Sequence, residues 1–135
     1  MNVSEIMTSN VELASPEESI QKAAQKMADL NTGVLPVGHN DRLVGMITDR
    51  DIAVRAVAKG LSPKTLVRDI MSKDVKYCFD DQEVDDIVAN MGEVRMRRLP
   101  VVNRDKRLVG IVSIGDIAVA HSPEAAGQAL SGIAT

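Results

Sequence analysis

The sequence predicts an α/β (α+β) fold in which two copies of one βαββα unit pack about a pseudo-twofold axis and a short C-terminal helix follows. Three observations predict it. The chain contains a long internal repeat, each copy contains an amphipathic helix with a polar start signal, and each copy then continues into a pair of short apolar strands.

The internal repeat runs through most of the chain in matching order. Val3 to Met7 returns as Val67 to Met71, and Leu35-Pro36-Val37 returns as Leu99-Pro100-Val101, both displaced by 64 residues. Leu43-Val44-Gly45 returns as Leu108-Val109-Gly110, and Asp51 to Val54 returns as Asp116 to Val119, both displaced by 65 residues. The one extra residue of the second copy falls in the polar stretch 103–107, where a hairpin turn tolerates an insertion.

The first helix of each copy is predicted from a cap followed by an apolar face. Ser15 suits an N-cap, Pro16 suits the first helical position, and Glu18 completes a capping box. In the second copy, Asp80 and Glu83 are the corresponding cap and box. Apolar residues then recur at helical spacing in both copies: Ile20, Ala23, Ala24, Met27 and Ala28, and Val84, Ile87, Val88 and Met91.

The rest of each copy is predicted as strands and a second helix. A short apolar run near Val11 predicts a first strand, and residues 33–37 and 43–48 predict a β-hairpin with a turn at 38–41. The second helix is predicted from Thr48 to about Lys59, and Gly60 ends it.

These elements divide the chain into four parts. We expect a first unit at 1–60, a linker at 61–66, a second unit at 67–121 and a helical tail at 122–135. The tail has its own start signal, Ser122-Pro123-Glu124, and no counterpart in the first copy.

Composition excludes several classes of function. The net charge is −3 and the only aromatic residues are Tyr77 and Phe79, which argues against nucleic-acid binding. The single cysteine, Cys78, cannot form an intramolecular disulfide, and neither a secretory signal nor a membrane-spanning stretch is present in the sequence. We therefore expect a cytoplasmic protein that binds no nucleic acid and no membrane.

No catalytic or metal-binding pattern stands out in the sequence. Nucleophile-elbow, Walker and Rossmann signatures are missing, so we expect no enzyme and no catalytic residues. His39, His121 and Cys78 lack the spacing of a metal site.

The repeated motifs resemble the CBS-domain family, specifically a stand-alone tandem pair (a Bateman module). The resemblance depends on an apolar-Pro-Val strand followed by an apolar-Gly strand and a [Ser/Thr]-x-x-Asp segment. The first set is Leu35-Pro36-Val37 with Leu43 to Asp51, and the second is Leu99-Pro100-Val101 with Leu108 to Asp116. It covers roughly residues 3–121, and we expect no attached catalytic or transport domain.

The resemblance implies a regulatory module that binds an adenosine-containing ligand in a cleft between the two units. AMP, ADP, ATP or S-adenosylmethionine would be the ligand, and no cofactor would be required. Asp51 and Asp116, helped by Thr48 and Ser113, would hold the ribose hydroxyls. Helix N-terminal amides there would suit a phosphate. The residues expected to enclose the base are Val11, Val34, Leu35, Pro36, Val75, Leu99 and Pro100, and those expected to meet phosphate are Arg50 and Arg98.

Two alternatives stay open. Thr48 to Asp51 and Ser113 to Asp116 are also ordinary capping boxes, and a residue can serve both purposes. The chain could instead be a ligand-free scaffold for dimerisation or for an unidentified protein partner. The resemblance implies a homodimer, with an apolar interface from the second helices: Ile52, Ala53, Ala56 and Val57, and Ile117, Ala118 and Val119.

Overall fold

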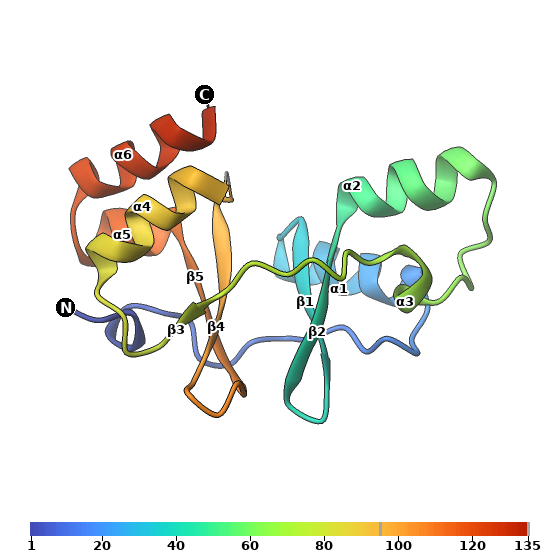
Figure 1. Ribbon diagram of the computed structural model, residues 1–135. Helices are drawn as coiled ribbons and strands as arrows, with labels where there is room; N and C mark the ends of the chain where they lie inside the picture. The colour runs from blue at the N-terminus through green and yellow to red at the C-terminus, as the bar shows by residue number, and fades with distance from the viewer. Residues whose placement is uncertain (95, 135) are drawn as a thin grey trace. The chain divides into compact units, whose positions relative to one another are not determined.

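The computed structural model describes residues 1–94 and 96–134 and contains two compact units (Figure 1). The first-repeat unit comprises Glu12–Val75, and the second-repeat unit comprises residues 1–11 together with those described from 76 onward. The mixed fold predicted from the sequence is confirmed, and each unit is described below by itself.

The first-repeat unit is built around a two-stranded antiparallel sheet. Its elements are α1 (Ile20–Leu30), β1 (Val34–His39), β2 (Arg42–Thr48), α2 (Asp49–Asp51), the π-helix η2 (Ile52–Ala56), the 3-10 helix η3 (Val57–Lys59) and α3 (Val67–Ile70). Strand β1 pairs with β2, and Ala14 adds a single parallel bridge to Val37. The first strand expected near Val11 is therefore reduced to this bridge.

The second-repeat unit carries a three-stranded sheet in the order β3-β4-β5. Its elements are the 3-10 helix η1 (Val3–Glu5), β3 (Cys78–Phe79), α4 (Val84–Val94), β4 (Arg98–Val102), β5 (Leu108–Ser113), α5 (Ile114–Ala120) and α6 (Pro123–Ala134). Strand β3 runs parallel to β4, and β4 runs antiparallel to β5. The repeat is thus preserved strand for strand, apart from the length of the first strand.

The leading segments of the two repeats are exchanged between the units. Thr8 and Ile111 donate backbone N–H groups to each other's carbonyls, at 2.9 and 3.0 Å. Ser72 and Met46 make the equivalent pair at 2.8 and 3.0 Å. The compact units therefore differ from the expected boundaries of 1–60 and 67–121: residues 1–11 fold with the second repeat, and residues 67–75 fold with the first.

Two glycines make this exchange possible. A Cβ on Gly45 would lie 2.6 Å from Met71 Sδ and 2.9 Å from the Ser72 carbonyl oxygen. Gly110 is equivalent, because its Cβ would lie 2.6 Å from Met7 Sδ and 2.8 Å from the carbonyl oxygen of Thr8. Only a residue without a side chain lets each leading segment approach the strand so closely, as expected for close-packing sites.

The first helix of the first repeat begins four residues later than the Pro16 start predicted from the sequence. Ser15 N–H donates to Glu18 Oε1 at 2.5 Å, but this pair closes a turn, and α1 starts at Ile20 with Ser19 as its N-cap. Ser19 Oγ accepts from Lys22 N–H at 3.1 Å. In the second repeat, Asp80 and Glu83, predicted as cap and box, both precede α4, which starts at Val84. The equivalent turn is closed there by Phe79 N–H, which donates to Gln82 Oε1 at 2.8 Å. A box-like side-chain contact can stabilise a turn as well as a helix start.

The second helix of the first repeat spans the predicted range, but its helical geometry is irregular. It passes from α2 through the π-helix η2 to the 3-10 helix η3. Gly60 ends it in the left-handed region, with φ of 72°, as its position predicted. The equivalent α5 is regular and seven residues long.

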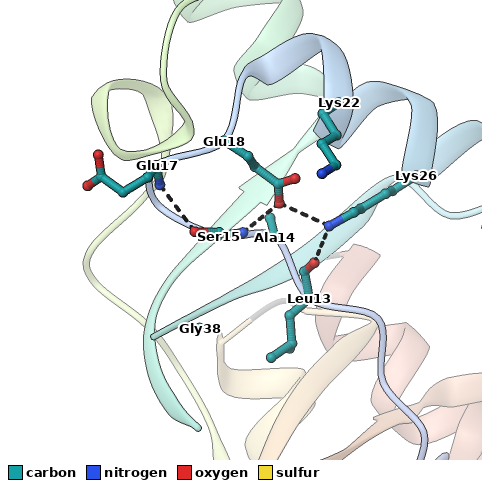
Figure 2. Close-up of a pocket in the computed structure, with 8 residues that line it drawn as sticks. All are labelled: Leu13, Ala14, Ser15, Glu17, Glu18, Lys22, Lys26 and Gly38. Atoms are coloured by element: carbon teal, nitrogen blue, oxygen red, sulfur yellow. Dashed lines mark hydrogen bonds and ion pairs between the residues drawn. The ribbon is translucent and has the colours of Figure 1, made fainter. Parts of the chain in front are cut away.

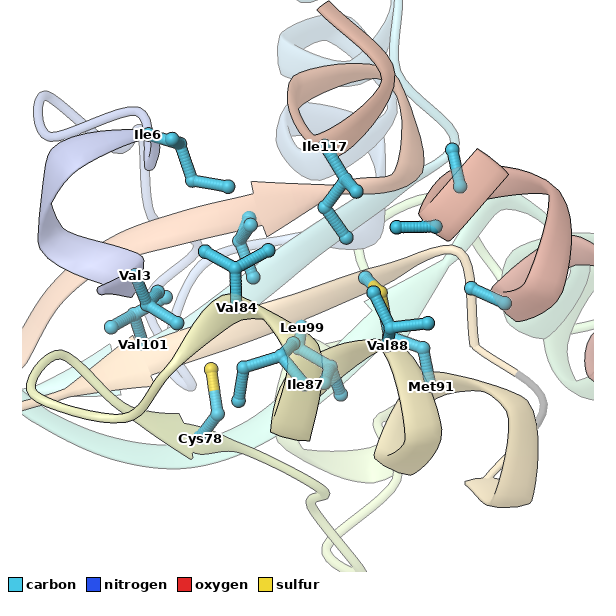
Figure 3. Packing of buried hydrophobic residues seen from close by; sticks show 14 residues of the cluster. Val3, Ile6, Cys78, Val84, Ile87, Val88, Met91, Leu99, Val101 and Ile117 are labelled. Carbon is cyan, nitrogen blue, oxygen red and sulfur yellow. The ribbon is translucent and has the colours of Figure 1, made fainter. Parts of the chain in front are cut away.

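Each unit has its own aliphatic core. In the second-repeat unit, α4 and the strands pack together with Val3 and Ile6 of the leading segment, as Figure 3 shows. Within the described residues, the helices are all too short or too polar to span a bilayer.

The tail helix α6 completes the core of the second-repeat unit. It lies against α4, where a Cβ on Gly132 would be 2.6 Å from Gly92 Cα. The predicted tail helix is thus present, and its alanines Ala125, Ala126 and Ala129 are buried in this core. Residue 135, at which the tail was expected to end, lies outside the described residues.

Candidate binding edges

The first edge consists of Gly33, Val34 and Thr48 to Asp51, where β2 ends and α2 begins. Thr48 is the N-cap, in extended conformation, and pairs with Val34 across the hairpin. Its Oγ1 accepts a hydrogen bond from Asp51 N–H at 3.0 Å, and Asp51 Oδ2 accepts one from Thr48 N–H at 3.0 Å. The predicted pair of Thr48 and Asp51 is therefore brought together as a complete capping box.

The second edge consists of Arg97, Arg98 and Ser113 to Asp116, where β5 ends and α5 begins. Ser113 is the N-cap and pairs with Arg98 across the hairpin. Its Oγ accepts from Asp116 N–H at 3.0 Å, while Asp116 Oδ2 accepts from Ser113 N–H at 2.9 Å. The two boxes have nearly identical geometry.

Each box leaves polar atoms available for a ligand. The aspartate uses Oδ2 within the box, so Oδ1 remains an acceptor, and each hydroxyl keeps its hydrogen as a donor. Asp51 Oδ1 lies 4.0 Å from Arg55 Nη1, and the Asp51 side chain is 20% exposed. A carboxylate oxygen held this rigidly can accept a hydrogen bond from a sugar hydroxyl without further ordering. The capping role and the binding role are therefore compatible.

The backbone amides at these edges are mostly occupied, contrary to the expectation that they would hold a phosphate. At the first edge, Asp49 N–H donates to the Gly33 carbonyl at 2.9 Å and Arg50 N–H to Asp49 Oδ1 at 2.8 Å. At the second edge, Ile114 N–H donates to the Arg97 carbonyl at 3.0 Å. Among the described residues, only the Gly115 N–H lacks an acceptor in these two first turns. Side chains must therefore provide most of the contacts to an anion.

The apolar residues expected around the base differ in what they can offer. Leu35 and Leu99 are 1% and 0% exposed and belong to the cores of their units, so their side chains are closed to a ligand. The residues that follow them on β1 and β4 are buried as well, so both faces of each strand are covered at this point. The remaining predicted residues are the buried Pro36 and Pro100 and the half-buried Val11, Val34 and Val75.

The predicted arginines lie on the surface of the two edges. Arg50 is exposed and lines an open pocket of about 420 Å³ with Asp49, Ala53 and Val54. Arg98 is exposed at the start of β4, and Arg97 directly precedes it. Sequence reasoning selected Arg98, which pairs with Ser113, but it missed Arg97, whose carbonyl accepts the Ile114 N–H at 3.0 Å.

A second pocket, which the sequence did not predict, lies between the segment before α1 and α1 itself. Figure 2 shows Lys26 reaching the Leu13 carbonyl at 2.7 Å and Glu18 Oε1 at 3.0 Å. Because the Lys26 charge is already paired with a Glu18 side chain that is only 9% exposed, the contact fastens this segment to the helix. The pocket measures about 430 Å³.

Cys78 is an inert core residue. Its side chain lies in the core of the second-repeat unit, and burial, with a smaller contribution from the Asp80 charge, raises the pKa of the thiol to about 12. A thiol with this pKa is a poor nucleophile and a poor metal ligand at neutral pH. Across residues 1–94 and 96–134, no three His, Cys, Asp or Glu side chains gather as a metal site would need.

The internal repeat agrees with a comparison against known protein families. The CBS domain family matches residues 3–57 and again 67–122. This chain belongs to the CBS-domain family. The CBS domain-containing protein YhcV of Bacillus subtilis (strain 168) is 41% identical to this CBS pair over 133 residues, covering 98% of this chain and 94% of YhcV.

Two solved structures that resemble this CBS pair contain adenosine compounds. The CBS domain pair of protein MJ0100, in complex with 5-methylthioadenosine and S-adenosyl-L-methionine, has a TM-score of 0.78 and 30% identity, with 92% of this chain and 98% of that chain covered. CBSX2, in complex with AMP, has a TM-score of 0.76 and 27% identity, with 88% and 94% covered.

Proposed function

We propose that this CBS pair is a regulatory module, without catalytic activity, that binds adenosine-containing ligands of the AMP, ADP, ATP or S-adenosylmethionine class. The observation that carries the proposal is the duplicated capping box, in which Asp51 and Asp116 each keep one carboxylate oxygen for a ribose hydroxyl. The AMP complex of CBSX2 and the S-adenosylmethionine complex of MJ0100 support the ligand class.

The chemistry proposed at each edge is simple recognition. The carboxylate accepts hydrogen bonds from the vicinal hydroxyls of the ribose, and Thr48 or Ser113 adds a hydroxyl donor beside it. Binding would regulate a partner by favouring one of two conformations, which requires a higher ligand affinity in that conformation.

The experiment is a thermal-shift screen with adenosine, AMP, ADP, ATP, S-adenosylmethionine and, for comparison, GMP. A ligand at about 100 times its dissociation constant should add about 2.7 kcal/mol to the apparent free energy of unfolding. Asp51→Asn with Asp116→Asn should abolish the shift, because the asparagine carbonyl still accepts the N-cap N–H while an amide donor replaces the free oxygen. This design keeps the caps that alanine would remove.

A matched control uses two exposed first-turn aspartates outside the edges. Asp69→Asn with Asp86→Asn removes the same charge, from α3 and α4, and should leave the ligand-induced shift unchanged. An adenosine-ligand shift that survives in Asp51→Asn/Asp116→Asn would exclude the edges as the binding site. No shift with any of these compounds at millimolar concentration would favour the ligand-free scaffold.

Exposed valines on the second helix of each repeat support a homodimer in addition to ligand binding. In the first-repeat unit Val54 and Val57 are 46% and 67% exposed, and in the second-repeat unit Val119 is 90% exposed. A contiguous patch of exposed apolar side chains is typical of a contact surface, and Val54 and Val57 lie one helical turn apart. We propose a homodimer that uses these residues. The expected contributions of Ala56 and Ile117 are wrong, because both are fully buried in their own units.

A cytoplasmic location is part of the same proposal. The one cysteine is a free, buried thiol that needs no oxidising compartment. Fractionation of cells that express the tagged chain would test this location, and recovery from the medium or membranes would contradict it.

A further inference from the structure

The two edges carry different charges at equivalent positions. The second edge has Arg97 and Arg98 where the first has Gly33 and Val34, and it has Ile114 where the first has Asp49. These positions are equivalent in space as well as in sequence. The residue after the N-cap donates its N–H to the Gly33 carbonyl at 2.9 Å in one unit and to the Arg97 carbonyl at 3.0 Å in the other.

Gly33 and Asp49 lie in close contact at the first edge. A Cβ on Gly33 would lie 2.8 Å from Asp49 Oδ2, so the carboxylate occupies the space in which a side chain at position 33 would begin. At the second edge, the equivalent of Asp49 is Ile114, which is partly buried against the core of its unit. A side chain at position 33 would therefore require the Asp49 carboxylate to move, whereas the second edge has no carboxylate at the equivalent position.

The arginines of the first edge do not compensate for its two carboxylates. Arg55 lies 4.0 Å from Asp51 and donates to the Ile70 carbonyl at 2.8 Å, so its charge is already used. Only Arg50 remains, and it sits next to Asp49 in the chain.

The arginines of the second edge are uncommitted. Neither Arg97 nor Arg98 makes a side-chain hydrogen bond or ion pair with any residue that the structure describes, and Asp116 is the only carboxylate of this edge. The position of Arg50 is taken there by Gly115, which leaves the approach open. The second edge thus has two exposed guanidinium groups and one carboxylate, whereas the first edge has two carboxylates and only the Arg50 guanidinium left to offset them.

This difference decides where a phosphate binds, because the backbone amides are largely occupied at both edges. Arginine pairs with phosphate through two parallel hydrogen bonds, whereas a carboxylate beside a phosphate repels it. We propose that the second edge takes the phosphate-bearing adenosine ligand, with Arg97 and Arg98 as its phosphate contacts. The first edge favours an adenosine ligand that lacks phosphate, either a neutral nucleoside or a sulfonium compound. This inference rests on the proposed function.

The test is isothermal titration of AMP and of adenosine into the full chain. Arg97→Gln with Arg98→Gln should weaken AMP binding by about tenfold or more and change adenosine binding less than about twofold, because two charge-assisted contacts to phosphate are lost. Lys59→Gln with Lys64→Gln is the matched control. It removes two exposed positive charges from the segment around Gly60, and AMP binding should stay within about twofold of the unmodified chain.

A second pair of variants assigns the edge independently of the arginines. Asp116→Asn should weaken AMP binding at least about tenfold more than Asp51→Asn does, and the order should reverse for S-adenosylmethionine. Raising NaCl from about 50 mM to about 300 mM should weaken AMP binding and spare adenosine.

The outcomes separate this inference from the proposed function. If the unmodified chain binds AMP and the Arg97→Gln/Arg98→Gln variant binds it equally well, the charge assignment is overturned while nucleotide binding stands. If Asp51→Asn is the variant that loses AMP, the assignment is likewise overturned. If neither AMP nor adenosine binds the unmodified chain, the proposed function fails and this inference fails with it.

Discussion

Replacing Gly110 by alanine should destabilise the second-repeat unit through a clash that the structure locates. The new Cβ would lie 2.6 Å from Met7 Sδ and 2.8 Å from the Thr8 carbonyl oxygen. The thioether can rotate away, but the Thr8 carbonyl cannot retreat, because it accepts a hydrogen bond from Ile111 N–H at 3.0 Å. Overpacking of this kind costs about 1–3 kcal/mol.

The magnitude sets the size of the expected shift in melting temperature. For a domain of 60–100 residues, each kcal/mol lowers the melting temperature by about 4–8 °C, so Gly110→Ala should melt at least about 4 °C below the unmodified chain. Calorimetry measures the shift, and urea unfolding gives the free energy separately. Adding Met7→Ala should recover only part of the loss, because the contact with the Thr8 backbone remains.

Gly127→Ala is the matched control for this experiment. Gly127 lies in α6, and a Cβ there would have nothing within 4 Å, so alanine should raise stability by about 0.5–1 kcal/mol through helix propensity. If Gly110→Ala melts as high as the unmodified chain, the close approach of the leading segment to β5 is refuted. Gly45→Ala should repeat the loss in the first-repeat unit, where the Ser72 carbonyl is 2.9 Å away.

Three further predictions concern other parts of the chain. Gly132→Ala should separate α6 from α4 and lower the melting temperature, since its Cβ would lie 2.6 Å from Gly92 Cα; an unchanged value would contradict their close packing. Gly60→Ala should cost about 1 kcal/mol in urea unfolding, because alanine is strained at φ of 72°. Cys78 should resist a thiol reagent at pH 8 until the chain is unfolded. The pKa of Cys78 in the folded chain, about 12, exceeds the ordinary thiol value of 9.0. The contribution of Cys78 to the free energy of unfolding is therefore complete below pH 9 and is lost as the pH rises towards 12. Rapid labelling of the folded chain at pH 8 would contradict the burial of this thiol.

Much of the fold could be predicted from local sequence signals. The 64- and 65-residue repeat located equivalent strands and helices, and Gly60 marked a helix end where the structure has a left-handed residue. The pairs Thr48 with Asp51 and Ser113 with Asp116 were found because a capping box joins residues only three positions apart. Interactions of this range are encoded in a few neighbouring side chains.

The start of the first helix shows the limit of such signals. Ser15 and Glu18 do form the predicted contact, but the helix begins only at Ile20. The starting residue of the helix depends on a distant segment that pairs with it. Ile20 N–H donates to the Thr65 carbonyl at 2.8 Å, and Val67 N–H donates to the Glu18 carbonyl at 2.9 Å. Periodicity cannot reveal a bond between residues so far apart in the chain.

The candidate site divides in the same way between sequence and structure. The sequence by itself determined the repeat, the family resemblance and the two aspartates, because these depend on residue types at fixed short spacings. Only the tertiary structure decided that the leading segments are exchanged, that Leu35 and Leu99 turn into the cores and that the first-turn amides are occupied. It also placed the Arg97 carbonyl against the Ile114 N–H at the start of α5. Each of these depends on which distant groups satisfy a backbone bond or exclude water, and that is fixed only when the whole unit has packed.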